Sequence, residues 1–237
     1  MPPSDAPRRL EQNQLLLALP RADYKALEKD LQDVTLPHGH VLFEPRERIT
    51  HVYFPQRCVI SLVAPIEGEK GVEVAIVGNE GMAGLSAFLG VDTASIQAVI
   101  QVPDAAKRLT VAAFRRALAR GTAMRRLMLR YTDSMLSQLA QCSACNQRHR
   151  VVQRCARWFL MTHDRVGADQ FSLTQEFLGQ MLDVERPTVS AAARLLQAAG
   201  AIRYSRGRVT VTNRASLESA ACTCYRVLVQ DYARAFA

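Results

Sequence analysis

The 237-residue sequence lacks long apolar runs, since its uninterrupted hydrophobic stretches fall far short of the roughly 18 residues that a membrane-spanning helix needs. Its N-terminal segment, MPPSDAPRRLEQNQ, also lacks the apolar core of a signal peptide. We therefore expect a cytoplasmic protein with no membrane contact. The first 57 residues contain no cysteine, and a chain of this length does not depend on disulfides, so we expect the six cysteines to be free thiols.

A catalytic signature is also lacking, because the carboxylates are scattered and the histidines are isolated. We therefore expect no enzymatic activity. Arginine is absent from residues 58–106, where Lys70 is the only cation against six acidic residues, so this segment carries a charge of −5. With 49% hydrophobic residues the chain can bury one large core or two modest ones, and we predict two domains.

What the chain has in abundance is arginine in its second part. Residues 1–104 hold 9 Lys and Arg against 14 Asp and Glu, a balance of −5, whereas residues 105–237 hold 21 against 8, a balance of +13. Twenty of those 21 cations are arginines, whose planar guanidinium groups suit bidentate binding of phosphate. This imbalance favours a polyanionic partner for the second part, with a solvated basic surface as the alternative.

The period of the hydrophobic pattern changes at about the same place as the charge. Short β-branched or aromatic segments between residues 34 and 102, among them VTLPHGHVLFEP and THVYFPQRCVISLVAP, predict an antiparallel β-roll or jelly roll. From residue 111 the pattern becomes helical, and the whole is an α+β fold. We predict an N-terminal tail at residues 1–20, a β-roll sensor domain at 21–120, a dimerisation helix at 121–148 and a winged helix-turn-helix domain at 149–237.

The predicted long helix carries an apolar stripe at spacings of three or four residues. Its length exceeds what a small roll needs for cover, so we expect the stripe to mediate a homodimer, with packing inside one subunit as the alternative. The stripe consists of Met124, Leu127, Met128, Tyr131, Met135 and Leu139.

The segment LTQEFLGQMLDVERPTVSAAARLLQAAGAIRYSRGRVTVTN, residues 173–213, predicts two short helices and a strand pair. Ser172 or Thr174 is suited to cap the first helix, and Asp183 tolerates the left-handed backbone that a tight turn requires. Pro187 fits the first turn of the second helix, which Gly200 ends. The hairpin that follows turns at residues 205–208 and is rich in arginine. Such an arrangement is a winged helix-turn-helix, which predicts binding to double-stranded DNA.

These residues resemble the Crp/Fnr family of bacterial transcription regulators over nearly the whole chain. The segments LPHGHVLFEP and ITHVYFP fit the family's β-roll, and QEFLGQMLDVERPTVSAAARLLQAAGAI fits its helix-turn-helix without a gap. The resemblance implies a two-fold homodimer that reads a pseudo-palindromic site and acts by contacting RNA polymerase or by blocking it. The alternative from another class is an effector-binding module that docks on an acidic protein and reads no DNA sequence.

The resemblance also assigns candidate contacts to DNA. Three base-reading positions fall on Arg186, Pro187 and Ala191; the arginine is suited to a guanine edge, and the other two offer only apolar contact, for example to a thymine methyl. Further candidates for phosphate or secondary contacts are Gln175, Thr188, Ser190, Arg194, Arg206 and Arg208.

The sensor departs from the cyclic-nucleotide-binding members of the family. Glu80 and Gly81 match the start of their ribose and phosphate site, but Ala94 and Ser95 stand about where an Arg-Ser pair would fall. We therefore predict that cAMP does not control the protein; the effector, if there is one, stays unknown.

Four cysteines invite a different hypothesis. Cys142, Cys145, Cys222 and Cys224 could in principle form a metal or redox site, but about eighty residues separate the two pairs. Small buried residues are the favoured interpretation, so we predict neither a metal nor a cofactor.

Overall fold

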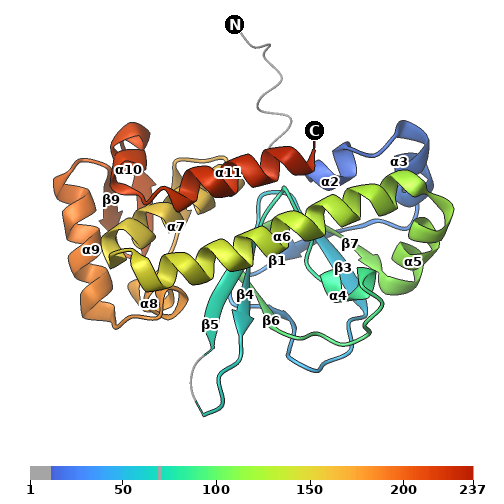
Figure 1. The fold of residues 1–237 in the computed structure, drawn as a ribbon, viewed down its shortest axis with the longest axis horizontal. Coiled ribbons are helices and arrows are strands. Elements are labelled where there is room, and N and C mark those ends of the chain that lie inside the picture. The colour runs from blue at the N-terminus through green and yellow to red at the C-terminus, as the bar shows by residue number, and fades with distance from the viewer. Residues whose placement is uncertain (1–11, 69–70, 237) are drawn as a thin grey trace, which may run out of the picture.

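The computed structural model describes residues 12–68 and 71–236, and its N-terminal part is a β-roll of two antiparallel sheets (Figure 1). One sheet has the order β1-β7-β3, formed by Gln32–Leu36, Asp104–Thr110 and His51–Pro55. The other has the order β2-β6-β4-β5, formed by Val41–Phe43, Gln97–Val102, Val59–Ala64 and Val72–Val77. The apolar faces of these strands are buried, so the predicted roll is confirmed.

Two short helices precede the roll, α2 (Gln14–Leu17) and α3 (Arg21–Glu28). Asn13 caps α2 and also donates its Nδ2 to the carbonyl oxygens of Pro55 and Gly81, at 2.9 and 2.7 Å. Leu15 and Leu16 are buried in the core of the roll. The predicted tail at residues 1–20 therefore ends too late: residues 13–19 belong to the roll because their leucines pack there, and residues 1–11 lie outside the described chain.

The roll itself contains one short helix, α4 (Leu85–Phe88), and longer helices follow the roll. Thr110 caps α5 (Val111–Arg120), and Gly121 separates α5 from α6 (Thr122–Arg148), a helix of 27 residues. The predicted long helix is present, and its role in dimerisation stays a prediction. On α6, Tyr131 donates its hydroxyl to the carbonyl of Met82 at 2.9 Å, and Gln138 donates to the carbonyl of Ile76 at 3.1 Å. The side of α6 that carries these residues thus faces the roll.

This packing corrects the assignment of the apolar stripe on α6. Its members lie in the core of their own subunit, where they cover the roll; Met124, Leu127, Met128, Tyr131 and Met135 are buried, and Leu139 is partly buried against them. Periodicity identified the apolar face correctly, but the roll occupies it, so these side chains are not available to a second subunit. The opposite face of α6 is exposed and carries Leu129 and Leu136, 57% and 60% exposed.

The C-terminal part contains the predicted winged helix-turn-helix. Its helices α7 (Val151–Val166), α8 (Gln175–Leu182), α9 (Arg186–Ala198) and α10 (Arg214–Ala220) surround a sheet of order β8-β10-β9, formed by Gln170–Ser172, Arg208–Val211 and Ile202–Ser205. A second core of buried residues, centred on Trp158 and Phe159 of α7, unites these elements.

The last helix, α11 (Cys224–Ala235), leaves this domain and lies beside α6 (Figure 1). Ser134 donates its Oγ to the carbonyl of Asp231 at 3.3 Å, and Ser137 donates to the Asp231 carboxylate. Tyr225 and Leu228 of α11 are nevertheless buried in the second core, so the helix joins that core to α6, and the predicted domain at residues 149–237 stays a prediction.

A polar network joins the β-roll to α7. On β5, Glu73 Oε2 is 2.6 Å from Ser61 Oγ, and Glu73 Oε1 accepts a hydrogen bond from Trp158 Nε1 at 2.8 Å. Gln101 Nε2 donates to Thr162 Oγ1 at 3.2 Å. Burial raises the pKa of Glu73 from 4.5 to about 7, although its hydrogen bonds and nearby arginines lower it.

A buried ion pair lies in the same interface. Arg165 Nη2 is 2.8 Å from Glu80 Oε1, and both side chains are less than a tenth exposed. These contacts hold the C-terminal domain against the roll and thereby set the direction in which α9 faces.

Candidate DNA-binding surface

The turn between α8 and α9 has the local geometry that the sequence predicts. Thr174 Oγ1 accepts from Phe177 N at 3.1 Å and starts α8, and Asp183 ends it in the left-handed conformation at φ 50° and ψ 56°. A Cβ on Gly179 would lie 2.8 Å from the carbonyl oxygen of Val184, so the turn passes too close for any other residue. Pro187 lies in the first turn of α9, where its missing N–H costs nothing.

Helix α9 presents the predicted contact residues on its outer face. Arg186, Pro187, Thr188, Ala191 and Arg194 are exposed, while the opposite face of the helix is buried in the domain core.

Ser190 and Gln175 behave differently from these five. Ser190 is partly buried, and its Oγ lies 2.7 Å from Gln175 Oε1 and 3.0 Å from the carbonyl oxygen of Arg186, two acceptors for its single proton. These bonds fix α9 on α8 and leave the Ser190 hydroxyl proton with partners inside the protein. Contact of any of these residues with DNA stays a prediction.

The wing extends the same surface. Arg206 and Gly207, both at positive φ (47° and 72°), form the turn between β9 and β10 at the predicted place. Arg203, Arg206 and Arg208 are exposed. A groove runs between the wing and the helix-turn-helix, and its lining includes Gln175, Arg186, Tyr204 and Arg206.

The arginines of this surface have no acidic partner. Within residues 12–68 and 71–236, no ion pair engages the side chains of Arg186, Arg194, Arg203, Arg206 or Arg208. Their charges are therefore available to phosphates, and each neutralised phosphate would release counterions.

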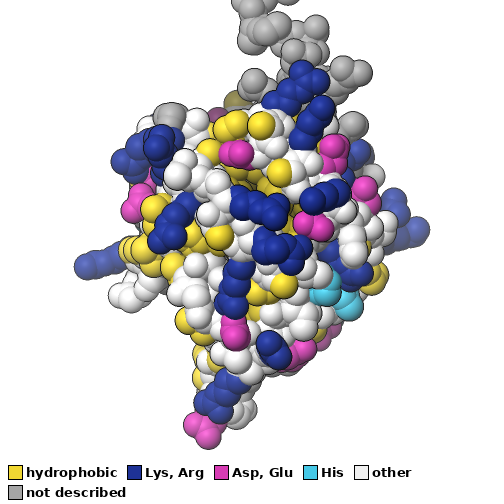
Figure 2. All heavy atoms as spheres, turned by 90° about the vertical axis from the view of Figure 1, so that its right-hand side faces the viewer, with side chains coloured by type: hydrophobic (Ala, Val, Ile, Leu, Met, Phe, Trp, Pro, Cys, Tyr) yellow, Lys and Arg dark blue, Asp and Glu magenta, His cyan; other side chains and the backbone are white. Residues whose placement is uncertain are grey.

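Much of the excess charge in residues 105–237 lies elsewhere, which the charge count alone did not reveal. Arg154, Arg157 and Arg165 of α7 are buried and act inside the protein. Figure 2 shows further Lys and Arg side chains, mixed with acidic ones, on the end of the molecule formed by α3, α5 and the start of α6. There Arg115 pairs with Asp92. The balance of +13 therefore overstates the charge that faces DNA.

The region that resembles a cyclic-nucleotide pocket is occupied by protein groups. The Glu80 carboxylate is engaged by Arg165, which arrives from α7. The Tyr131 ring lies against Gly81, where an added Cβ would come within 2.5 Å of its hydroxyl oxygen. The sequence indicated the missing arginine but not the aromatic side chain that fills this space.

The structure also brings together residues that the sequence separates. Cys145, Cys222 and Cys224 converge with His149, which sequence analysis did not include in the cluster. Cys142 stands apart, with Arg157 Nη1 3.4 Å from its Sγ. The spacing of Cys145 and His149, four residues on one helix face, was the available signal for adding the histidine.

Comparison with known protein families recognises the C-terminal part of the chain. Residues 153–220 match the model of the Crp-like helix-turn-helix domain. No curated protein matches the sequence. No helix in the described parts of the chain is long and apolar enough to cross a membrane.

Solved structures of regulators share the fold of the chain. FixK2 from Bradyrhizobium japonicum is 15% identical, with a TM-score of 0.69 over 81% of this chain and 98% of that one. A putative regulator of the Crp/Fnr family from Eubacterium rectale is 14% identical, with a TM-score of 0.65 over 90% and 97%. The c-di-GMP responsive regulator CLP from Xanthomonas campestris is 12% identical, with a TM-score of 0.63 over 82% and 100%.

Proposed function

We infer that this chain is a Crp/Fnr family transcription regulator, and that it binds operator DNA as a homodimer with α9 in the major groove. The observation that carries this inference is the match of residues 153–220 to the Crp-like helix-turn-helix domain, whose second helix exposes Arg186 and Arg194. Transcription would change through contact with RNA polymerase or through blocking it.

Base recognition is assigned to the N-terminal half of α9. Arg186 is exposed and forms no ion pair with a described residue, so its guanidinium is suited to donate two hydrogen bonds to O6 and N7 of a guanine. Pro187 and Ala191, exposed on the same helix, offer apolar contact to a thymine methyl. Thr188, Arg194 and the wing arginines at 206 and 208 would bind phosphates, which fixes the position of the helix without reading sequence.

The outer face of α6 supports the homodimer. Leu129 and Leu136 are seven residues apart and more than half exposed, and Ala140 extends their row after a further four residues. Spacings of seven and four residues keep these side chains on one face of the helix, as in the seam between paired helices. A two-fold axis along this seam would present two copies of α9 to half-sites about 34 Å apart on one side of the duplex.

We propose that cAMP does not control the protein, because protein side chains occupy the region that resembles a cyclic-nucleotide pocket. A cyclic phosphate carries a full negative charge, which needs a cation or several directed donors when buried. The closest buried cation to Glu80 is Arg165, and it is already paired with that carboxylate. The Tyr131 ring packs against Gly81 and hydrogen-bonds to Met82, so a nucleotide would have to displace a buried aromatic side chain.

The test is selection of bound sequences from a random duplex pool, followed by affinity measurements on the selected site at two salt concentrations. We expect a two-fold symmetric site. Arg186→Ala should weaken binding to it by about 1–3 kcal/mol and relax the preference at one base pair in each half-site.

Two control variants separate base reading from charge. Arg206→Ala should weaken all sequences alike and reduce the salt dependence, and Arg226→Ala, an exposed arginine on α11, should change neither. Equal affinity for every duplex would contradict the proposal and favour a protein-interaction module; an unchanged preference in Arg186→Ala would contradict the role of that residue.

A further inference from the structure

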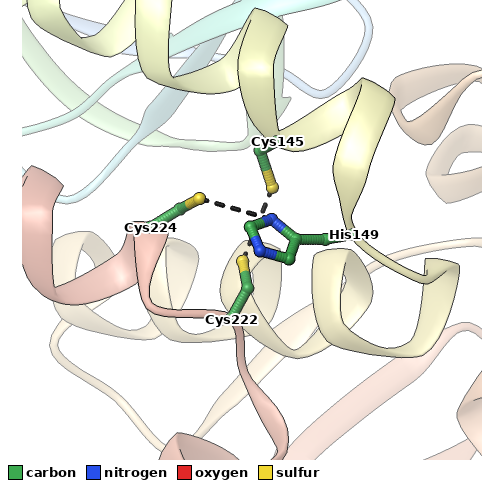
Figure 3. A group of neighbouring side chains, drawn as sticks. All are labelled: Cys145, His149, Cys222 and Cys224. Atoms are coloured by element: carbon green, nitrogen blue, oxygen red, sulfur yellow. Dashed lines mark hydrogen bonds between the residues drawn. The ribbon is translucent and has the colours of Figure 1, made fainter.

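The most unusual cluster of side chains outside the DNA-binding surface lies where α6 ends and α11 begins. Cys145, His149, Cys222 and Cys224 point their sulfur and nitrogen atoms toward one another (Figure 3). Their potential ligand atoms all lie within 4.8 Å of one another. The three cysteines are at most 4% exposed, and they form a small buried cluster separate from both large cores.

The separations fit a tetrahedral metal centre. Cys145 Sγ is 3.5 Å from Cys222 Sγ, and Cys224 Sγ is 3.5 Å from His149 Nδ1. With metal–sulfur bonds of about 2.3 Å and metal–nitrogen bonds of about 2.0 Å, tetrahedral angles place two sulfurs about 3.8 Å apart and a sulfur and a nitrogen about 3.5 Å apart. These two separations fit a shared ion, and the others, all within 4.8 Å, would have to shorten by at most about 1.3 Å.

Local structure explains how the four ligands meet. Cys145 and His149 are four residues apart at the end of α6, so they lie on one side of its last turn, and His149 is the C-cap of the helix. Cys222 and Cys224 come from the short connection between α10 and α11, with Thr223 as the N-cap of α11 between them. The end of α6 and the start of α11 therefore lie next to each other in the fold.

The surroundings favour an anionic centre. Arg154 and Arg157 are about 5% exposed, and the Nε of each is buried without a hydrogen-bond partner among the described residues. Neither arginine forms an ion pair with a described residue, and Cys145 and Cys222 are among the groups that interact electrostatically with both. Gln141 Nε2 also lies 2.9 Å from Cys224 Sγ, as a donor to a thiolate would.

We propose that Cys145, His149, Cys222 and Cys224 bind one Zn²⁺ ion. Binding releases the three thiol protons to solvent, and the neutral imidazole supplies the fourth ligand. The centre then carries a net charge of −1, which the two positive charges of Arg154 and Arg157 more than offset. All four positions are filled by protein, which makes the site structural. The ion would hold the start of α11 against the end of α6 at the junction with the DNA-binding domain.

The test is the zinc content of the full-length protein, purified with reductant and freed of unbound metal by gel filtration. We expect one zinc per chain in the wild type, and background zinc in Cys222→Ser and in Cys145→Ser. Cys142→Ser is the matched control, because Cys142 lies one turn before Cys145 on α6 but outside the group, and this variant should keep its zinc. Loss of zinc from the control to the same extent, or background zinc in the wild type, would overturn the proposal.

A second measurement avoids variants that fold poorly. Wild type stripped with a chelator under anaerobic conditions and titrated with Co²⁺ should develop the absorption of a tetrahedral thiolate complex at one ion per chain. Hydrogen exchange in α11 should rise on stripping and fall again with Zn²⁺. A spectrum of octahedral Co²⁺, or a disulfide between Cys145 and Cys222 in the protein as purified with reductant, would show that the cluster does not serve as a zinc site.

Discussion

Replacing Glu73 with Gln is expected to remove a pH dependence from the folding stability. The Glu73 carboxyl lies in the interface between the roll and α7, where Ser61 Oγ is 2.6 Å from one oxygen and Trp158 Nε1 is 2.8 Å from the other. Ser61 Oγ is also 2.8 Å from Gln101 Oε1, yet a serine hydroxyl has only one proton. A protonated Glu73 satisfies all three groups, since it donates to Ser61, which then donates to Gln101.

The magnitude follows from the pKa. Burial raises the pKa of Glu73 from 4.5 to about 7, so between these values the folded state holds a proton that the unfolded state has lost. The stability from this group is fully present below pH 4.5 and is lost as the pH rises through about 7. At about 1.36 kcal/mol per pKa unit, the loss amounts to about 3 kcal/mol.

Glu73→Gln imitates the protonated form, because its amide can accept from Trp158 and donate to Ser61. The variant should match the wild type near pH 5 and exceed it by about 3 kcal/mol near pH 8. Urea unfolding followed by the fluorescence of Trp158, the single tryptophan, measures the difference at each pH. Glu67→Gln, on an exposed part of the same hairpin, is the control and should track the wild type. If the difference in the free energy of unfolding between wild type and Glu73→Gln stays constant within about 0.5 kcal/mol from pH 5 to pH 8, the reasoning is refuted.

Three further predictions concern assembly, ligand binding and the interface between domains. The double variant Leu129→Asp, Leu136→Asp should sediment as a folded monomer and bind the operator more weakly, because both leucine side chains are exposed on α6. A variant that stays dimeric would place the interface elsewhere. Calorimetry with cAMP and with cGMP should detect no tight binding, and micromolar affinity coupled to tighter DNA binding would contradict the occupied pocket. Glu80→Ala should lower the free energy of unfolding by about 3–5 kcal/mol, since it leaves the Arg165 guanidinium buried without its carboxylate. Replacing both residues with Met should recover most of that loss, and a loss below about 1 kcal/mol in the single variant would show that the pair contributes little.

The helix-turn-helix could be predicted from the sequence in detail because its signals are local. The Thr174 cap, the left-handed Asp183 and the proline at position 187 each act within one turn of chain, and all three occur where the pattern indicated. The hairpin turn at Arg206 and Gly207 is equally local. Short β-branched and aromatic segments likewise predicted the roll, because such residues are typical of strands.

Tertiary structure alone decided what covers each apolar face and what meets each buried charge. The stripe on α6 was read correctly as apolar, but only the folded chain shows that the roll occupies it and leaves Leu129 and Leu136 outside. The charge count assigns Arg165 to a basic surface, but in the folded chain this arginine is buried and paired with Glu80, 85 residues away. Cys145 and Cys222 are 77 residues apart, and they meet only because α11 returns along α6. Periodicity and capping describe a residue's neighbours within a few turns, whereas these contacts depend on how whole elements pack, which no local pattern encodes.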